Sequence, residues 1–129
     1  MVVFSNHRIG PSAELLVSHE VAAELLREVA AAAGPSAQAR WEHELVSWLQ
    51  CCATSGPAQL ASLDVSDIAW TPENFERQRS FLLEAIERAM AASANARALA
   101  RWSAMIEAHP RESVQVGRRW HWRAAKITA

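Results

Sequence analysis

The stretch SAELLVSHEVAAELLREVAAAAGPSAQARWEHELVSWLQCC (residues 12–52) contains two apolar stripes separated by the pair Gly34-Pro35. From Ser12 to about Ala33, apolar residues recur at the spacing of an α-helix. They are Leu15, Ala22, Leu25, Leu26 and Val29. From Ser36 to about Thr54 a second stripe follows, made of Trp41, Leu45, Trp48, Leu49 and Cys52. Because so short a linker joins them, the sequence predicts an antiparallel helical hairpin.

Two further helices are predicted downstream of this hairpin. The stretch TPENFERQRSFLLEAIERAM (residues 71–90) opens with Thr71 as a cap and Pro72 at the first helical position. Glu84 and Arg88 lie four residues apart in it, a spacing that favours an ion pair along one helix face. A fourth helix is predicted from about Asn95 to Ala108, ended by Pro110. Residues 62–70, SLDVSDIAW, alternate only weakly and predict a loop or a short strand.

The stretch VGRRWHWRAA (residues 116–125) decides the prediction for the chain's end. A loop from Gly117 to Arg119 would pair Val116 with Trp120 and Val114 with Trp122, all on one face of a β-hairpin. A helix with Trp120, Ala124 and Ile127 on one side is the competing interpretation.

These patterns together predict one fold class. The fold is expected to be mainly α, a bundle of about four helices with a small C-terminal β-hairpin that a short N-terminal strand could join. The chain has 129 residues, half of them hydrophobic and 21% charged, which is typical of one globular domain spanning residues 1–129. A chain of this length folds without a metal or disulfide to hold it together.

Charge is distributed unevenly along the chain. Residues 1–110 carry eight arginines and thirteen acids, a net of 8 − 13 = −5, whereas residues 111–129 carry five basic side chains and one acid, a net of 5 − 1 = +4. The positive end suggests a nucleic-acid-binding regulator as an alternative function. Its phosphate-binding residues would be Arg118, Arg119, Arg123 and Lys126. The predicted hairpin buries both nearby tryptophans, which leaves no exposed ring for base stacking.

Catalytic signatures are absent from the sequence: it has no phosphate-binding glycine loop, no paired CxxC, no HExxH and no GxSxG. The predicted hairpin places His19 opposite Cys51, where an imidazole could activate a thiol. A small enzyme or metal site built on scattered His, Cys and Glu is therefore a second alternative. Glu42-His43-Glu44 lacks the Glu-x-x-His spacing of bundle metal sites, and free cysteines are commonly core residues. We predict no catalytic residue, no metal and no cofactor.

The first predicted helix carries Glu20, Glu24 and Glu28 at intervals of four residues. A row of carboxylates at this spacing repels itself unless a cation lies beside it, so we expect the row to bind a basic partner protein. Trp70, just before the third helix, is expected to be the half-exposed aromatic anchor of the same interface, with packing across the helix start as the alternative. Trp41 and Trp48 are assigned to the core.

The leading functional prediction is a non-enzymatic protein–protein interaction module, such as an adaptor, an inhibitor or an immunity-like protein. Its partner is expected to be another protein, with nucleic acid as the lesser alternative and no membrane. MVVFSNHRIG, the first ten residues, lack a basic leader and a long apolar run, and no stretch approaches the ~20 apolar residues that span a bilayer. We therefore expect a cytoplasmic protein.

Overall fold

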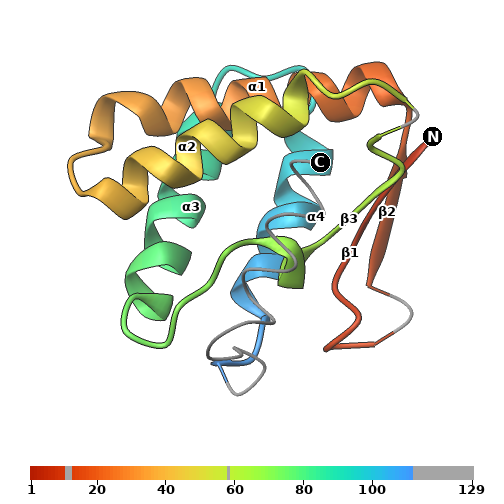
Figure 1. Ribbon diagram of the computed structural model, residues 1–129. Coiled ribbons are helices and arrows are strands. Elements are labelled where there is room, and N and C mark those ends of the chain that lie inside the picture. The colour runs from red at the N-terminus through yellow and green to blue at the C-terminus, as the bar shows by residue number, and fades with distance from the viewer. Residues whose placement is uncertain (11–12, 58, 112–129) are drawn as a thin grey trace.

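The structure, a computed structural model, describes residues 1–10, 13–57 and 59–111. Its elements follow one another from the N-terminus as shown in Figure 1. They are β1 (Val2–Ser5), β2 (Glu14–Val17), α1 (His19–Ala33), η1 (Gly34–Ser36), α2 (Arg40–Ala53), β3 (Ser62–Asp64), η2 (Val65–Asp67), α3 (Phe75–Met90) and α4 (Ala96–Glu107), where η marks a short 3₁₀ helix.

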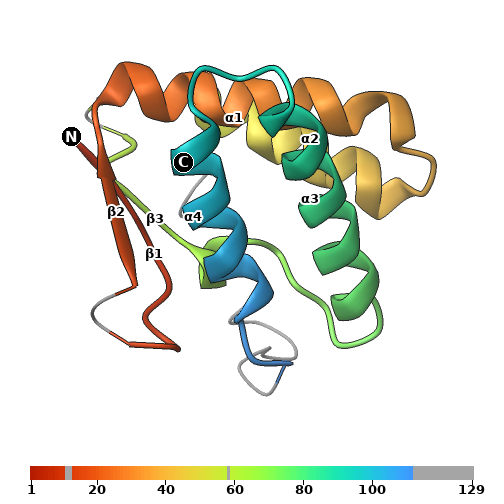
Figure 2. The same ribbon diagram turned by 180° about the vertical axis from the view of Figure 1, so that it is seen from behind.

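Two helical hairpins cross one another. α1 and α2 run side by side in opposite directions, and they lie across the upper ends of the α3–α4 pair in both views (Figures 1 and 2). The strands stand at one end of the molecule, next to α4 (Figure 2). α1 is central to the packing, and its residues Leu25, Leu26 and Val29 are fully buried. The predicted hairpin of the first two helices is therefore present.

A three-stranded mixed sheet is built from the N-terminal half of the chain, in the order β2-β1-β3. β1 pairs antiparallel with β2 and parallel with β3. Phe4 lies between Leu15 and Leu63 in this register, so the three buried side chains form a row across the sheet. The ring of Phe4 meets Trp102 of α4 edge to face, with centroids 5.3 Å apart. This contact holds the sheet against the helices.

The predicted fold class is wrong in its β part. The sequence interpretation placed a hairpin at the C-terminus, whereas the sheet of the described residues is N-terminal, mixed and three-stranded. The proposed hairpin positions, Val114 to Trp122, lie outside the described residues. The central pairing joins β1 to β3, far apart in sequence, and apolar periodicity within one segment carries no information about such a partner.

Two predicted helix starts are also displaced. Glu14–Val17, expected in the first helix, forms β2, and α1 begins after Ser18, whose Oγ accepts a hydrogen bond from the Val21 N–H at 3.2 Å. α3 begins at Phe75 and not beside Thr71. Thr71 instead closes a turn, accepting the N–H of Asn74 on its Oγ1 at 3.3 Å. None of the helices in the described part of the chain is both long and apolar enough to cross a membrane.

Candidate functional site

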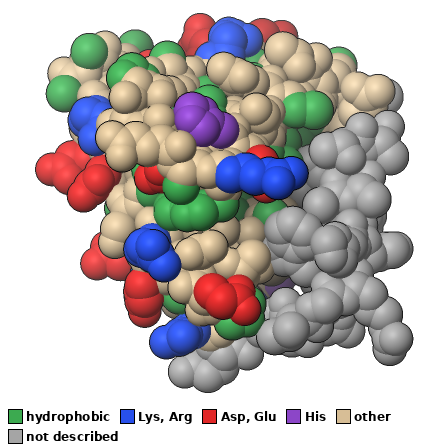
Figure 3. Space-filling model, turned by 60° about the vertical axis from the view of Figure 1, so that its left-hand side comes forward, with side chains coloured by type: hydrophobic (Ala, Val, Ile, Leu, Met, Phe, Trp, Pro, Cys, Tyr) green, Lys and Arg blue, Asp and Glu red, His purple; other side chains and the backbone are tan. Residues whose placement is uncertain are grey.

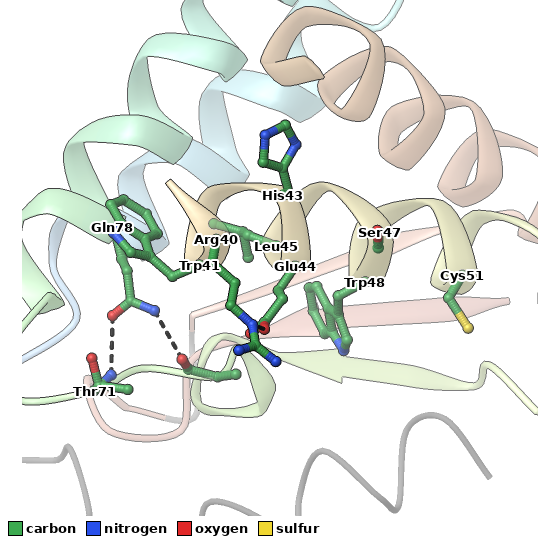
Figure 4. A pocket seen from close by; sticks show the side chains of 11 residues that line it. Arg40, Trp41, His43, Glu44, Leu45, Ser47, Trp48, Cys51, Thr71 and Gln78 are labelled. Carbon is green, nitrogen blue, oxygen red and sulfur yellow. Dashed lines mark hydrogen bonds and ion pairs between the residues drawn. The ribbon is translucent and has the colours of Figure 1, made fainter. Parts of the chain in front are cut away.

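A groove of about 610 Å³ lies between α2 and the segment that leads into α3. Figure 4 shows its walls from close by. α2 contributes Arg40, Trp41, His43, Glu44, Leu45, Ser47, Trp48 and Cys51, and the opposite side contributes Ala69, Thr71 and Gln78. Most of the exposed lining surface belongs to apolar atoms, so the groove can take up an apolar ligand surface.

The groove follows one face of α2 because its lining residues recur at helical spacing. Trp41, Leu45, Trp48 and Cys51 are separated by four, three and three positions. From Arg40 to Cys51 this face is about 16 Å long at 1.5 Å per residue. The neighbouring face of the same helix, with Leu45, Val46, Leu49, Cys52 and Ala53, is buried against the core. Trp41 and Trp48 stand at the border of that buried face, only partly covered.

The wall opposite α2 is fixed by one buried side chain. Gln78 of α3 is 4% exposed, and its amide donates a hydrogen bond to the Ala69 carbonyl at 2.8 Å. Its Oε1 accepts the N–H of Thr71 at 3.0 Å, and both bonds are drawn in Figure 4. The two hydrogen bonds satisfy backbone groups of residues 69–71 as a neighbouring strand would, and they hold this segment beside α2.

One polar atom in the groove wall has no partner. The indole Nε1 of Trp48 is buried, and within the described part of the chain it makes no hydrogen bond. A buried donor without an acceptor is unfavourable by about 1 to 3 kcal/mol, and such atoms in native proteins call for an explanation. Because the atom is buried, it is not part of the accessible surface of the groove.

The charged side chains at the rim are largely matched to each other. Arg40 Nε donates to Glu44 Oε1 at 3.0 Å, and both side chains are exposed. In Figure 4, Trp48 and Cys51 point downward from α2, to the side of the helix on which Thr71 lies, whereas His43 points upward. The apolar floor is thus open to a ligand, and the charged pair marks one border.

The structure reverses the expected exposure of the tryptophans. Trp70, predicted as a half-exposed anchor, is only 3% exposed. Its Nε1 donates to the Val65 carbonyl at 2.9 Å, and its ring packs on Phe75, the first residue of α3, at 5.0 Å between centroids. The alternative of packing across a helix start describes it better. Trp41 and Trp48, which the sequence interpretation assigned to the core, line the groove.

The three glutamates of α1 lie where the sequence placed them, but two have internal contacts. Glu24 Oε2 accepts a hydrogen bond from the Asn95 amide at 3.1 Å, and Glu28 Oε1 accepts one from Ser93 Oγ at 3.0 Å. These donors belong to the turn between α3 and α4. Glu20 is exposed in the first turn of α1. Within the described residues the row is accompanied by neutral donors and not by a cation, and its role as a partner-binding surface stays a prediction.

The cysteine–histidine pair considered as an alternative across the first hairpin is not hydrogen-bonded. His19 Nε2 lies 3.1 Å from the Ser55 carbonyl and donates to it, so that nitrogen is unable to accept a thiol proton. Cys51 is exposed at the end of the groove. Burial raises the pKa of the Cys52 thiol to about 12, which keeps it protonated and unreactive. The described residues contain no group of three or more His, Cys, Asp and Glu side chains that could hold a metal ion.

A polar cluster at the ends of the parallel strands was missed by the sequence interpretation. Asp64 accepts hydrogen bonds from Ser5 Oγ at 2.9 Å, from the His7 N–H at 2.9 Å and from the Ser66 N–H at 2.9 Å. His7 Nδ1 also lies 3.1 Å from the carboxylate. Burial alone would raise the pKa of Asp64, but the hydrogen bonds from Ser66, His7 and Ser5 together lower it below its ordinary value.

The signal for this cluster was present but weak. β1 and β3 are parallel neighbours, and Ser5 and Asp64 are their last residues. Polar side chains often gather at the edge of a sheet where parallel strands end. Recognising it required the pairing of β1 with β3. The cluster ties the sheet to the following turns, because the Asp64 carboxylate accepts hydrogen bonds both from Ser5 in β1 and from Ser66 after β3.

The basic residues proposed for nucleic-acid binding, Arg118, Arg119, Arg123 and Lys126, lie outside the described residues, and that function stays a prediction. Comparison with protein-family models, curated proteins and solved structures finds no match to this chain, so the chemistry of the groove has to be inferred from its own residues.

Proposed function

We propose that this protein is a non-enzymatic interaction module that binds a segment of another protein in the groove along α2. The observation that carries the proposal is the combination of an open apolar groove of about 610 Å³ and two tryptophans in its wall. Tryptophan is the residue type most enriched among binding hot spots, because it presents a large rigid surface.

The length of the groove supports a polypeptide ligand. A face of about 16 Å matches three turns of a helix or about five residues of extended chain. An amphipathic helix that lays its apolar side into such a groove is a recurrent recognition mode.

Two side chains of types that serve in catalysis are engaged in contacts with the protein itself. His19 donates to a backbone carbonyl, and Cys52 is held as a buried thiol. These contacts favour an interaction role over the alternative of a small enzyme. We propose that the module acts in the cytoplasm, as expected from the sequence.

The test uses a phage-displayed library of random 16-residue peptides, selected on the purified protein. Enriched peptides are then titrated against Ser47→Arg, whose added side chain projects from an exposed position into the groove. The matched control is Gln50→Arg, which adds the same charge at an exposed position of α2 outside the groove lining. A maleimide adduct at Cys51 blocks the groove by an independent route.

We expect micromolar binding that falls at least tenfold in Ser47→Arg and in the Cys51 adduct and is unchanged in Gln50→Arg. Selection that yields only peptides insensitive to both blocks, or yields no peptide at all, would overturn the proposal.

A further inference from the structure

We infer that the partner segment is amphipathic and basic: its apolar side fills the groove along α2, and a lysine or arginine next to that side contacts an acidic depression beyond Trp41. This inference deepens the proposed function and rests on it. The surface that carries it continues from the groove across Trp41 onto α3.

A second depression adjoins the groove at Trp41. It has a volume of about 300 Å³ and is formed by α2 and α3. Trp41 lines both hollows, and its ring meets Phe81 of α3 edge to face at 5.7 Å between centroids. The pair of rings is therefore a ridge shared by the two hollows. A segment that lies in the groove passes directly over this ridge into the second depression.

The second depression is acidic. Its lining contains the carboxylates Glu42, Glu76 and Glu84 and the single guanidinium of Arg77, a net of 1 − 3 = −2. Figure 3 turns one side of the molecule forward, where acidic and basic side chains surround green hydrophobic ones. The groove and the depression together form a track that is apolar along one part and negative along the other.

The internal contacts of these carboxylates leave negative charge available. Glu42 Oε1 accepts the backbone N–H groups of Gln38 and Ala39 at 2.9 and 2.7 Å, which are neutral donors. Glu76 is paired with Arg79. Glu84 is exposed and has no hydrogen bond or ion pair within the described residues.

Among the described residues, the cation that is spaced to pair with Glu84 is engaged elsewhere. Arg88, four residues further along α3, is spaced to pair with it, but its guanidinium donates to the Ala32 carbonyl and to Ser36 Oγ, both at 3.1 Å. Ala32 lies in the last turn of α1, and Ser36 lies in η1, which follows it. The cation that the sequence supplies for Glu84 thus binds elsewhere, and a cation from a partner completes the pair.

A basic amphipathic segment satisfies both parts of the track at once. Its apolar side chains replace water on Trp41, Trp48 and Cys51, and its positive charge approaches Glu84. Charge complementarity of this kind speeds association and selects the orientation of the segment more than it raises affinity. An acidic segment of the same apolar pattern meets like charge and is disfavoured.

The experiment uses those selected peptides whose binding is weakened by Ser47→Arg. We expect them to carry lysine or arginine within one helical turn of their apolar residues. Glu84→Lys should weaken their binding about two- to fivefold, the range of exposed ion pairs, and should reduce the salt dependence of the association rate. Glu87→Lys is the matched control, because it makes the same change at an exposed position of α3 outside the depression.

The two proposals fail in different ways. Peptides that depend on Ser47 but lack basic residues, or that ignore Glu84→Lys, overturn the basic partner and leave the groove as a binding site. Peptides that ignore Ser47→Arg overturn the groove itself. Concentration-dependent dimerisation that Ser47→Arg abolishes would assign the groove to a second copy of this chain, and it too would overturn the inference.

Discussion

The imidazole of His109 stacks on the indole of Trp70, with ring centroids 5.5 Å apart and 24° between the ring planes. Both side chains are buried, at 1% and 3% exposed. His109 Nδ1 also lies 3.4 Å from Asn6 Oδ1, and the Asn6 amide donates to the Met105 carbonyl at 2.8 Å. The stack therefore joins three segments: the end of β1, the loop before α3 and the chain after α4.

Acid should weaken this junction through His109. Burial lowers its pKa to about 4 from an ordinary value of 6.5; the negative charge of Asp64 opposes this shift, and the positive charges of Arg8 and Arg79 add to it. Between those values the unfolded chain binds more protons than the folded one, so the free energy of unfolding falls as pH drops from 6.5 to 4. We expect a loss of up to about 1 kcal/mol per pH unit, measured by urea denaturation at pH 7, 6 and 5.

His109→Gln is the control for this pH dependence, because its side chain is polar and does not titrate. Its free energy of unfolding should be lower at pH 7 but flatter from pH 6.5 to 4. The pKa of Asp64 is lowered, so its contribution is present above its ordinary value of 3.8 and is lost only as pH falls through the folded value. An unchanged slope in His109→Gln would show that another group titrates.

Trp70 should be a stability residue and not a binding residue. Trp70→Ala removes a buried ring and is expected to lower the free energy of unfolding by about 3 to 5 kcal/mol. Trp70→Phe keeps most of the packing but loses the hydrogen bond to the Val65 carbonyl, and should cost about 1 to 3 kcal/mol. Urea denaturation measures both. Peptide affinity of folded Trp70→Phe should equal that of the wild type, and a tenfold loss would contradict the assignment.

Gln78 should affect both stability and binding, because it holds the wall of the groove. Gln78→Ala removes the bonds to Ala69 and Thr71 and should lower the free energy of unfolding by about 1 to 3 kcal/mol. The groove peptides should bind it more weakly, as fluorescence anisotropy would show. Ser80→Ala, at an exposed position of the same helix, is expected to stay within about 0.5 kcal/mol of the wild type. Equal effects from both variants would argue against a fixed wall.

The adjacent cysteines should differ sharply in reactivity. Cys51 is exposed, whereas Cys52 is buried and its pKa is raised to about 12. Native protein should take up one maleimide per chain by mass spectrometry, and two after unfolding in guanidinium chloride. Cys51→Ser should take up none until it unfolds. Rapid double labelling of native protein would mean that Cys52 is accessible and that α2 packs differently against the core.

The sequence predicted the helices because each carries its own signal. The stripe around Leu25, Leu26 and Val29 repeats within α1 and needs no distant partner to be recognised. β2 was missed because Leu15 also fits the register of that helical stripe and Leu16-Val17 leads into the helix without a break. The usable signal was Ser18, which caps the true start of α1.

The site was harder to predict than the helices for a related reason. Trp41 and Trp48 share a stripe with core residues, but helical spacing does not say how far a neighbouring element extends over that stripe. Whether a ring is covered depends on where residues 69–71 are held, and that depends on Gln78. Trp70 was misplaced for the same reason, since its cover comes from His109, far along the chain.

The position of β1 in the middle of the sheet has a consequence for the order of folding. Its pairing with β2 closes a short hairpin, but its pairing with β3 joins Phe4 to Leu63, 63 − 4 = 59 positions away. Closing this long loop costs more conformational entropy than closing the β1–β2 hairpin, and contacts of high sequence separation slow folding. The α1–α2 hairpin shortens the effective loop once it has formed. The arrival of β3 beside β1 is therefore expected to be a late event, governed by how early the two helices pair.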